Sequence, residues 1–372
     1  MKVPYFEPWI TNDDKKNVLK SLENRWLTNG PFLSKFENKF KHFINSKHAL
    51  GVGSATQALH LATRALNIGP GDEVIVPTFT FAATANSVLY CGAKVVLVDV
   101  DPQTFNISID SIKKHISKKT KAIIPVHYGG QSCDMDELKS LAKSKHLSII
   151  EDCAHALGSK FGNSMCGSIG DIGCFSFYPT KIITTGEGGM VTTNNNNFNK
   201  KIRQLRSQGM DVTPNQREKS ITWKYDIVDL GYNYRLDEIR SSLGLSQLNR
   251  INKINKLRIK IANQYNKLLK NVIGLSLPLI KSNRNHIFHL YSIKIEKDYP
   301  FTRDELFNKL NKKGIGTSVQ YYPLHLMSYN KNKYDNLDFP VANKIKDQIL
   351  CLPIFPTMNQ KQIEYVVSNL IN

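Results

Sequence analysis

Residues 175–189 read FSFYPTKIITTGEGG, and they join two short apolar runs, at 172–177 and 189–193, that have the composition of β-strands. Lys181 therefore lies in a loop of hydroxyl-bearing residues and glycines. A free lysine has a pKa near ~10.4 and is a poor nucleophile, so a reactive lysine requires a desolvated site or nearby cations. The glycines permit positive φ angles and close backbone approach, which suits a loop around a bound anion. Lys181 is thus the candidate catalytic residue; the ordinary alternative is a surface charge.

A second segment, Ile149-Ile150-Glu151-Asp152, places two carboxylates at the end of an apolar run. In open α/β sheets, ligands bind at the carboxyl ends of the strands. Side chains alternate along a strand, so Glu151 is expected to point away from Asp152 and not to bind a cofactor. A lysine that can form a Schiff base and a buried aspartate that can hold a pyridinium nitrogen protonated are the pair that pyridoxal phosphate (PLP) chemistry requires. The alternative for Asp152 is a structural carboxylate at a strand end.

Five further motifs extend this interpretation along the chain. They are Val3-Pro4, RWLTNGP at 25–31, GPGDEVIVP at 69–77, GYNYRL at 231–236 and LPIFP at 352–356. With these motifs in this order, the chain resembles the DegT/StrS-type (DegT/DnrJ/StrS) aminotransferases. These are PLP enzymes of fold type I that act on nucleotide-linked keto sugars. The resemblance runs nearly end to end, which makes it specific.

The spacing of apolar runs agrees with an α/β fold. Between residues 72 and 152, β-branched runs alternate with helical patterns such as 135–146, which predicts a mostly parallel sheet flanked by helices. The runs lie at 73–76, 94–100, 122–126 and 147–150. The resemblance implies a large domain with a seven-stranded, mostly parallel sheet and a smaller C-terminal α/β domain.

Two lobes are expected from the length alone, because 372 residues exceed the usual size of one core. We expect a catalytic domain at 1–245 and a small domain at 246–372. A long helical pattern from 236 to about 270 would bridge them. The small domain would contain the segments 287–294, 303–312, 317–321 and 361–370. By the resemblance, the first ~20 residues pack with the small lobe.

The cofactor phosphate has its own predicted site. A helical pattern at 55–66 follows Gly51-Val52-Gly53-Ser54, so the amides at its start would form an anion site. The resemblance assigns the phosphate to the amides of Ala55 and Thr56, the Thr56 hydroxyl and Ser176. Many relatives have glycine where this chain has Ala55. Capping of the helix by Ser54 is the structural alternative.

The resemblance also assigns three other cofactor contacts. Phe81 would stack on the pyridine ring, with Phe79 facing the opposite way if the segment is extended. His155 would touch the phenolic oxygen or flank the ring. Asn233 would reach the phosphate of a partner subunit, which implies an obligate homodimer with shared active sites. Core packing for Phe81, a structural histidine and a turn stabilised by Asn233 are the alternatives.

Substrate contacts are harder to assign. The candidates are Tyr178, Arg235, Tyr321, Tyr322 and His325. Relatives often have histidine where this chain has Gln320, which weakens the analogy. A basic side chain such as arginine near the entrance could bind a diphosphate bidentately. We expect no metal site, because the pair His286 and His289 lies where a strand begins.

The resemblance implies a homodimeric aminotransferase that moves an amino group, from L-glutamate, onto a keto carbon of a nucleoside-diphosphate keto-deoxy sugar. His155 favours carbon C4, and the product would enter amino-sugar or surface-polysaccharide synthesis. A C3-aminotransferase and a PLP-dependent sugar dehydratase are alternatives in the family, although dehydratases have histidine where Lys181 stands. An alternative of a different class is a regulatory or nucleic-acid-binding protein on the same fold.

Composition restricts the remaining classes. The chain is 41% hydrophobic and 22% charged, as in soluble enzymes. No apolar run approaches the ~18–20 residues that span a bilayer, and the N-terminus lacks a signal-peptide core, so we expect a cytoplasmic protein without a membrane partner. The formal charge of +19 comes with frequent Lys, Asn and Ile throughout and with no nucleic-acid-binding motif, so we expect a solvated basic surface. The six cysteines lack C-x-x-C spacing and are expected to be reduced and buried.

Overall fold

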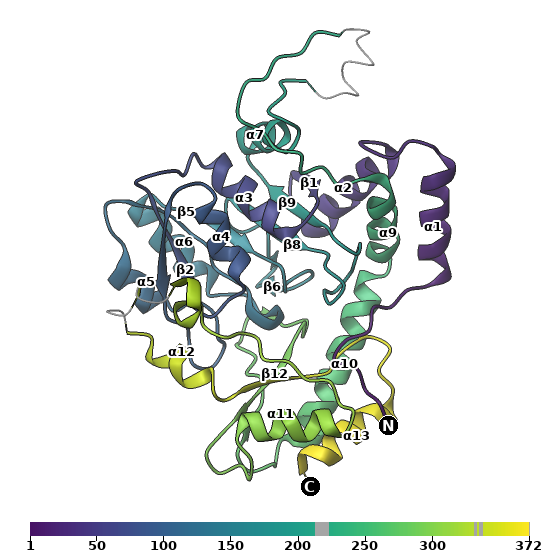
Figure 1. The fold of residues 1–372 in the computed structure, drawn as a ribbon, viewed down its shortest axis with the longest axis vertical. Helices are drawn as coiled ribbons and strands as arrows, with labels where there is room; N and C mark the ends of the chain where they lie inside the picture. Colours follow the sequence, from purple (N-terminus) through teal and green to yellow (C-terminus); the bar gives the residue numbers. More distant parts are fainter. Residues whose placement is uncertain (213–222, 331–332, 335–337, 372) are drawn as a thin grey trace.

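The centre of the molecule is a seven-stranded sheet (Figure 1). The computed structural model describes residues 1–212, 223–330, 333–334 and 338–371. Across the sheet, the strands are β1 (His48–Val52), β9 (Gly189–Thr193), β8 (Ile172–Ser176), β5 (Ser148–Asp152), β4 (Thr120–Ile123), β2 (Glu73–Pro77) and β3 (Lys94–Val98). β9 is antiparallel to both β1 and β8, and the other pairs are parallel. The prediction of a mostly parallel seven-stranded sheet is therefore confirmed.

Helices cover both faces of this sheet. On one face are α3 (Ala55–Ala65), α4 (Ala82–Leu89) and α7 (Asn196–Arg206), and on the other are α2 (Pro31–Ile44), α5 (Ile109–His115) and α6 (Met135–Lys145). Within β2, Val74 and Val76 pack with the first group, whereas Ile75 packs with α5 and α6. Because such strands are buried on both faces, their sequences are continuous apolar runs rather than alternating ones.

A second sheet forms a separate core in the C-terminal part of the chain. Its strands are β10 (Leu275–Ser276), β12 (Tyr291–Ile295) and β13 (Ile349–Leu352), all antiparallel. They share a hydrophobic cluster with α10 (Ile251–Leu269), α11 (Arg303–Lys312) and α13 (Gln360–Ile371). Val3 joins this cluster and pairs with Ile315, and Figure 1 shows both termini at this end of the molecule. The division of the chain at 245/246 stays a prediction.

Several further elements complete the described fold. α1 (Asn12–Glu23) packs against α9 (Glu238–Leu248). A small antiparallel sheet is formed by β11 (Arg284–Asn285), β6 (Lys160–Phe161) and β7 (Ser164–Met165). The chain also contains α12 (Pro340–Ile345) and the 3-10 turns η1 (Tyr128–Gly130), η2 (Leu324–Leu326) and η3 (Ser328–Asn330).

The prediction of one long helix over 236–270 is wrong, because α9 and α10 are separate. Arg250 leaves the helical conformation, with φ −115° and ψ 15°. Its guanidinium donates to the carboxylate of Asp14 at 2.7 and 2.5 Å and to the carbonyl of Trp9 at 2.7 Å. These partners lie more than 230 positions away in the sequence, so a local pattern could not indicate the break.

Two predicted strand limits also differ from the structure. The run at 122–126 forms a strand only to Ile123, and Pro125, which has no amide hydrogen, follows. The run at 287–294 enters the sheet only at Tyr291, because the amides of Ile287 and Leu290 bond to the carbonyls of Gly130 and Gly129 instead. Both errors concern ends of elements that exist.

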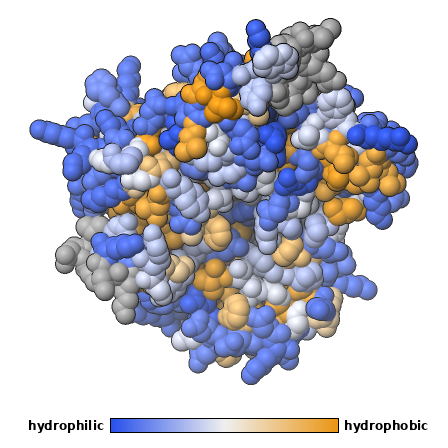
Figure 2. Space-filling view, turned by 45° about the horizontal axis from the view of Figure 1, so that its top comes forward, coloured by the Kyte–Doolittle hydropathy of each residue, from blue (hydrophilic) through white to orange (hydrophobic). Residues whose placement is uncertain are grey.

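The surface was expected to be solvated. Figure 2 shows a face that is mostly hydrophilic, with apolar side chains in separate groups. All six cysteines are buried and unbridged, as predicted. Among the described residues, the structure contains no helix with both the length and the apolar character that crossing a membrane requires.

Candidate active site

A cavity of about 610 Å³ lies at the carboxyl ends of the parallel strands. Most of the predicted site residues line it, namely Ala55, Thr56, Phe81, Asp152, His155, Ser176, Tyr178, Lys181 and Tyr321. Asp152 ends β5 and Ser176 ends the neighbouring strand β8. The structure thus brings together residues that are up to 266 positions apart in the sequence (321 minus 55), at the place where open α/β sheets bind ligands.

One wall of the cavity is the start of α3. The Ser54 side chain caps this helix by accepting the Gln57 amide hydrogen at 3.2 Å. The first amides of a helix have no partner within the helix, so those of Ala55 and Thr56 are available to an anion. Gly189 lies directly against this turn, since a Cβ there would be 2.6 Å from the carbonyl carbon of Ser54. A glycine is therefore needed for β9 to approach the anion site.

Asp152 is a buried carboxylate with two protein donors. The Ala154 amide donates to Oδ1 at 3.1 Å, and the Thr84 hydroxyl donates to Oδ2 at 2.8 Å. Burial raises the pKa of Asp152, and these two bonds and the charge of Lys181 only partly offset this effect. A cationic ring nitrogen beside Asp152 would favour the ionised carboxylate.

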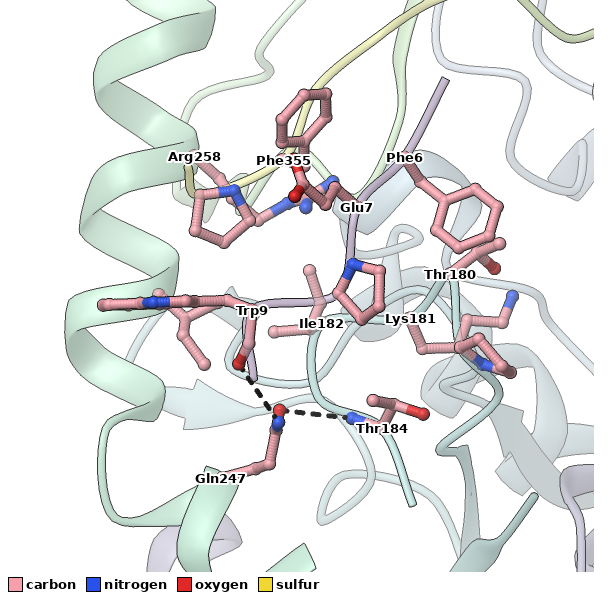
Figure 3. Close-up of a pocket in the computed structure, with 14 residues that line it drawn as sticks. Phe6, Glu7, Trp9, Thr180, Lys181, Ile182, Thr184, Gln247, Arg258 and Phe355 are labelled. Carbon is pink, nitrogen blue, oxygen red and sulfur yellow. Dashed lines mark hydrogen bonds between the residues drawn. The ribbon is translucent and has the colours of Figure 1, made fainter. Parts of the chain in front are cut away.

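Lys181 occupies the loop between β8 and β9. Burial lowers its pKa to about 8, although the negative charge of Asp152 opposes the shift. The loop is held from behind, where Gln247 of α9 accepts the Thr184 amide hydrogen at 3.4 Å and donates to the Trp9 carbonyl at 3.3 Å (Figure 3). The lowered pKa leaves a larger fraction of the Lys181 amine neutral and nucleophilic near pH 7 than in a free lysine.

Aromatic side chains form the remaining walls. Phe81, the residue before α4, is 63% exposed, and its ring centroid lies 6.2 Å from that of Tyr321. Phe79 is buried among Phe105 and Tyr128, so it faces the opposite way as expected. An exposed ring at the edge of the cavity is consistent with stacking on a planar ligand.

His155 is held in one orientation by two contacts. Its Nδ1 accepts the Gly129 amide hydrogen at 3.3 Å, so Nε2 carries the hydrogen that is donated to the Tyr321 hydroxyl at 2.8 Å. Burial, aided by the charge of Lys181, lowers the pKa of His155 well below its usual range. His155 is thus a neutral imidazole that orients Tyr321.

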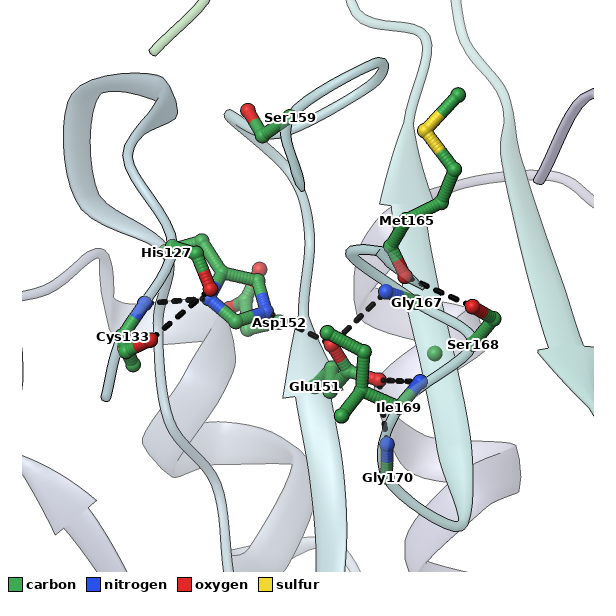
Figure 4. A network of polar contacts seen from close by, with 12 residues as sticks. His127, Cys133, Glu151, Asp152, Ser159, Met165, Gly167, Ser168, Ile169 and Gly170 are labelled. Carbon is green, nitrogen blue, oxygen red and sulfur yellow. Dashed lines mark hydrogen bonds and ion pairs between the residues drawn. The ribbon is translucent and has the colours of Figure 1, made fainter. Parts of the chain in front are cut away.

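Glu151 faces away from the cavity, as the alternation of β5 predicts. Its carboxylate accepts from His127 at 2.9 Å and from the amides of Gly167, Ile169 and Gly170 at 2.7–2.8 Å (Figure 4). Burial alone would raise its pKa, but these bonds lower it. The network fixes the end of β5 from behind and so supports the position of Asp152.

Among the described residues, His127, Glu151 and Cys153 also form a group whose potential metal ligands lie within 4.8 Å of one another. The His127 Nε2 bonds to Glu151, and Nδ1 accepts the Cys133 amide hydrogen at 3.1 Å. Because both ring nitrogens are engaged, this arrangement is a hydrogen-bonded core rather than a metal centre.

Four predicted residues do not line the cavity of the single chain: Asn233, Arg235, Tyr322 and His325. The backbones of Asn233 and Arg235 pair with Ser207 and Val52. His325 bonds to Thr78 at 2.7 Å and to Asn343 at 3.1 Å. Their roles in binding stay predictions.

Comparison with known proteins now decides the family. The sequence profile of the DegT/DnrJ/EryC1/StrS aminotransferase family matches residues 8–371. The chain belongs to this family. It is therefore an aminotransferase, as the sequence motifs indicated, and its fold is that of the sugar aminotransferases.

Individual relatives cover almost the whole chain. The spore coat polysaccharide biosynthesis protein SpsC of Bacillus subtilis is 38% identical, with 98% of this chain and 95% of that protein covered. The GDP-perosamine synthase of Caulobacter vibrioides is also 38% identical, with 98% and 96% covered. The PLP-form structure of Spr1654 from Streptococcus pneumoniae is 30% identical, with a TM-score of 0.93 and with 100% and 98% of the two chains covered.

Some residues that line the cavity of this aminotransferase were not predicted from the sequence as site residues. They include Thr80, Thr84, Glu187 and Gln320. Thr84 carries no signal of its own, because threonines in helices are ordinary, and Thr80 lies in the bend before α4. Glu187 lies within the lysine motif and Gln320 beside Tyr321, so their position in the motifs could have indicated both.

The pKa of Lys181 yields a testable pH dependence. Below this pKa the amine is protonated and unreactive. In cofactor-free protein, the rate at which acetic anhydride acetylates Lys181 should therefore rise with pH, with a midpoint near pH 8. Peptide mass spectrometry at successive pH values measures the rate. Nα-acetyl-lysine, which keeps its ε-amine, is the control in the same mixture, and its midpoint should be ~10.4.

The same experiment on Asp152→Asn checks the cause. Because the carboxylate raises the pKa of Lys181, its removal should move the midpoint below that of the wild type. A wild-type midpoint equal to that of Nα-acetyl-lysine would contradict the assignment of a desolvated amine.

Proposed function

We propose that this chain is a PLP-dependent aminotransferase that moves an amino group from L-glutamate to a keto carbon of a nucleoside-diphosphate keto-deoxy sugar. The sugar C=O becomes a CH–NH₂ group, and glutamate becomes its 2-oxo acid. The observation that carries the proposal is the presence of Lys181 and Asp152 in one cavity beside the start of helix α3, whose first amides are available to an anion. Carbon C4 is the proposed position of amination.

The residues of the cavity fit each part of PLP. The amides of Ala55 and Thr56 and the hydroxyl of Ser176 suit the phosphate, and Asp152 suits the ring nitrogen. The exposed ring of Phe81 suits the ring face. When bound, the cofactor accepts electrons from the amino donor and carries its amino group.

Lys181 would have two tasks. Its amine would hold the cofactor through the aldehyde carbon, and when free it would serve as the base and acid for a proton between Cα of the donor and C4′ of the cofactor. A pKa of about 8 suits both the acceptance and the return of that proton near neutral pH. Asp152 would face the ring nitrogen and favour its protonated form, and His155 keeps Tyr321 oriented at the cavity wall.

The class of acceptor and the destination of the product are inferred from relatives. The name of the Caulobacter relative refers to GDP-perosamine, and that of the Bacillus relative to spore coat polysaccharide. We therefore propose a nucleotide-linked keto sugar as acceptor and a polysaccharide amino sugar as the destination. Tyr178, Tyr321 and the basic Arg235 are the proposed contacts, together with Tyr322 and His325.

Two rivals make different predictions. A sugar dehydratase of this family would not need Lys181, whose place is taken by histidine in such relatives. A regulatory or nucleic-acid-binding protein on this fold would bind DNA in a salt-sensitive way and would lack a stable chromophore. The presence of Lys181 favours amination over dehydration, and the absorbance band and DNA binding discriminate the regulatory rival.

Lys181→Ala tests the proposal. In wild-type enzyme loaded with PLP, L-glutamate should discharge the visible absorbance band, and a panel of nucleotide keto sugars should restore it and yield an amino sugar by mass spectrometry. Lys181→Ala should be slower by about 10³-fold or more, because its proton carrier is lost. Lys139→Ala, which changes an exposed lysine on α6, is the control. Wild-type rates in Lys181→Ala would refute the role of this amine.

We also propose an obligate homodimer in which Asn233 contacts the cofactor phosphate of the partner subunit. Asn233 does not line the cavity of its own chain, which is compatible with this arrangement. It lies between Tyr232 and Tyr234, whose rings stack at 4.9 Å and limit its position.

Asn233→Ala should weaken PLP binding by about tenfold while the dimer persists, because a hydrogen bond to a charged group is lost. Fluorescence titration measures the affinity, and light scattering measures the mass. Asn263→Ala, on the exposed face of α10, is the matched control. Unchanged affinity in a stable dimer would count against a shared site.

A further inference from the structure

Thr84 is a buried hydroxyl that touches the key carboxylate of the cavity. It lies in the first turn of α4 and is 1% exposed, and its Oγ1 donates to Asp152 Oδ2 at 2.8 Å. Thr80 Oγ1 lies 3.0 Å from Thr84 Oγ1 and is 2% exposed. With so little exposure, bulk water has little access to replace these bonds.

The direction of each hydrogen follows from the chemistry of the groups. An ionised carboxylate only accepts, so the single hydroxyl hydrogen of Thr84 is donated to Asp152. Thr80 must then donate to Thr84. Since the Ala154 amide donates to the other carboxylate oxygen at 3.1 Å, both oxygens of Asp152 have a donor from the protein.

A buried threonine in another helix uses its hydroxyl differently. Thr63 in α3 donates to the carbonyl of Leu59, four residues earlier, at 2.9 Å, which is the usual bond within a helix. Thr84 instead reaches a side chain on a strand 68 positions away in the sequence. Its contact is therefore directed at the site and is not a local helix bond.

We propose that Thr84 is a positioning residue that keeps Asp152 ionised and aimed at the ring nitrogen of PLP. This inference rests on the proposed function. Burial favours the neutral acid, whereas hydrogen bonds from donors favour the anion. A neutral acid would leave the ring nitrogen without its negative partner, so the hydroxyl of Thr84 acts on the cofactor through Asp152.

The placement of Thr84 also links two parts of the site. Its backbone amide donates to the carbonyl of Phe81 at 3.2 Å, so the same turn of α4 carries the ring expected to cover the cofactor and the hydroxyl that orders Asp152. A shift of this turn would alter ring stacking and the carboxylate together.

The test compares Thr84→Val, which keeps the shape and removes the hydroxyl, with Thr84→Ser, which keeps the hydroxyl. Thr63→Val is the matched control for loss of a buried helical hydroxyl. The readouts are the Kd of cofactor-free protein for PLP, the pH profile of the absorbance of bound PLP, and the melting temperature of the cofactor-free protein. Thr84→Val should bind PLP about tenfold more weakly and shift the pH profile. Thr84→Ser and Thr63→Val should stay within about twofold of the wild type.

Equal affinity and an equal pH profile in Thr84→Val and the wild type would overturn the inference. So would a Thr84→Ser variant as weak as Thr84→Val, since shape and not the hydroxyl would then matter. If Thr84→Val does not fold, Thr84→Ala is compared with Thr84→Ser by the same criteria. Failure of the wild type itself to bind PLP would contradict the proposed function and the inference with it, whereas equal PLP binding by the wild type and Thr84→Val would contradict the inference alone.

Discussion

The site depends on a cavity whose surroundings shift the pKa values of both an amine and a carboxylate. Burial lowers the pKa of Lys181 to about 8 and raises that of Asp152, and the charge of each group partly offsets the shift of the other. On an open surface, neither group would have its pKa shifted by burial in this way. The protein supports the anion with donors from Ala154 and Thr84, so that the charged form remains accessible despite burial.

The sheet and its neighbours produce this cavity. Neighbouring parallel strands β5 and β8 end at the same edge, and their last residues, Asp152 and Ser176, line the same cavity. On the other face of β5, the Glu151 network fixes the strand end. Gly189 permits β9 to approach the first turn of α3, where the unpaired amides lie. Glu151 and Gly189 thus hold the site in position without being among its reactive groups.

The sequence predicted the features that depend on local pattern. The alternation of strand and helix patterns predicted a mostly parallel sheet, and the resemblance to the family predicted which residues meet at its edge. The break at Arg250 was missed because it depends on Asp14, more than 230 positions away. Thr84 was missed because its role exists only through Asp152, 68 positions away. Long-range contacts, which a single sequence does not reveal, decided both cases.

The most direct measurement of the central claim is borohydride reduction of PLP-loaded protein followed by peptide mapping. Reduction makes a lysine–PLP linkage permanent, so the labelled peptide identifies the amine. The account predicts a pyridoxyl label on Lys181 and on no other lysine. A label on a different residue, or none in fully loaded protein, would contradict it.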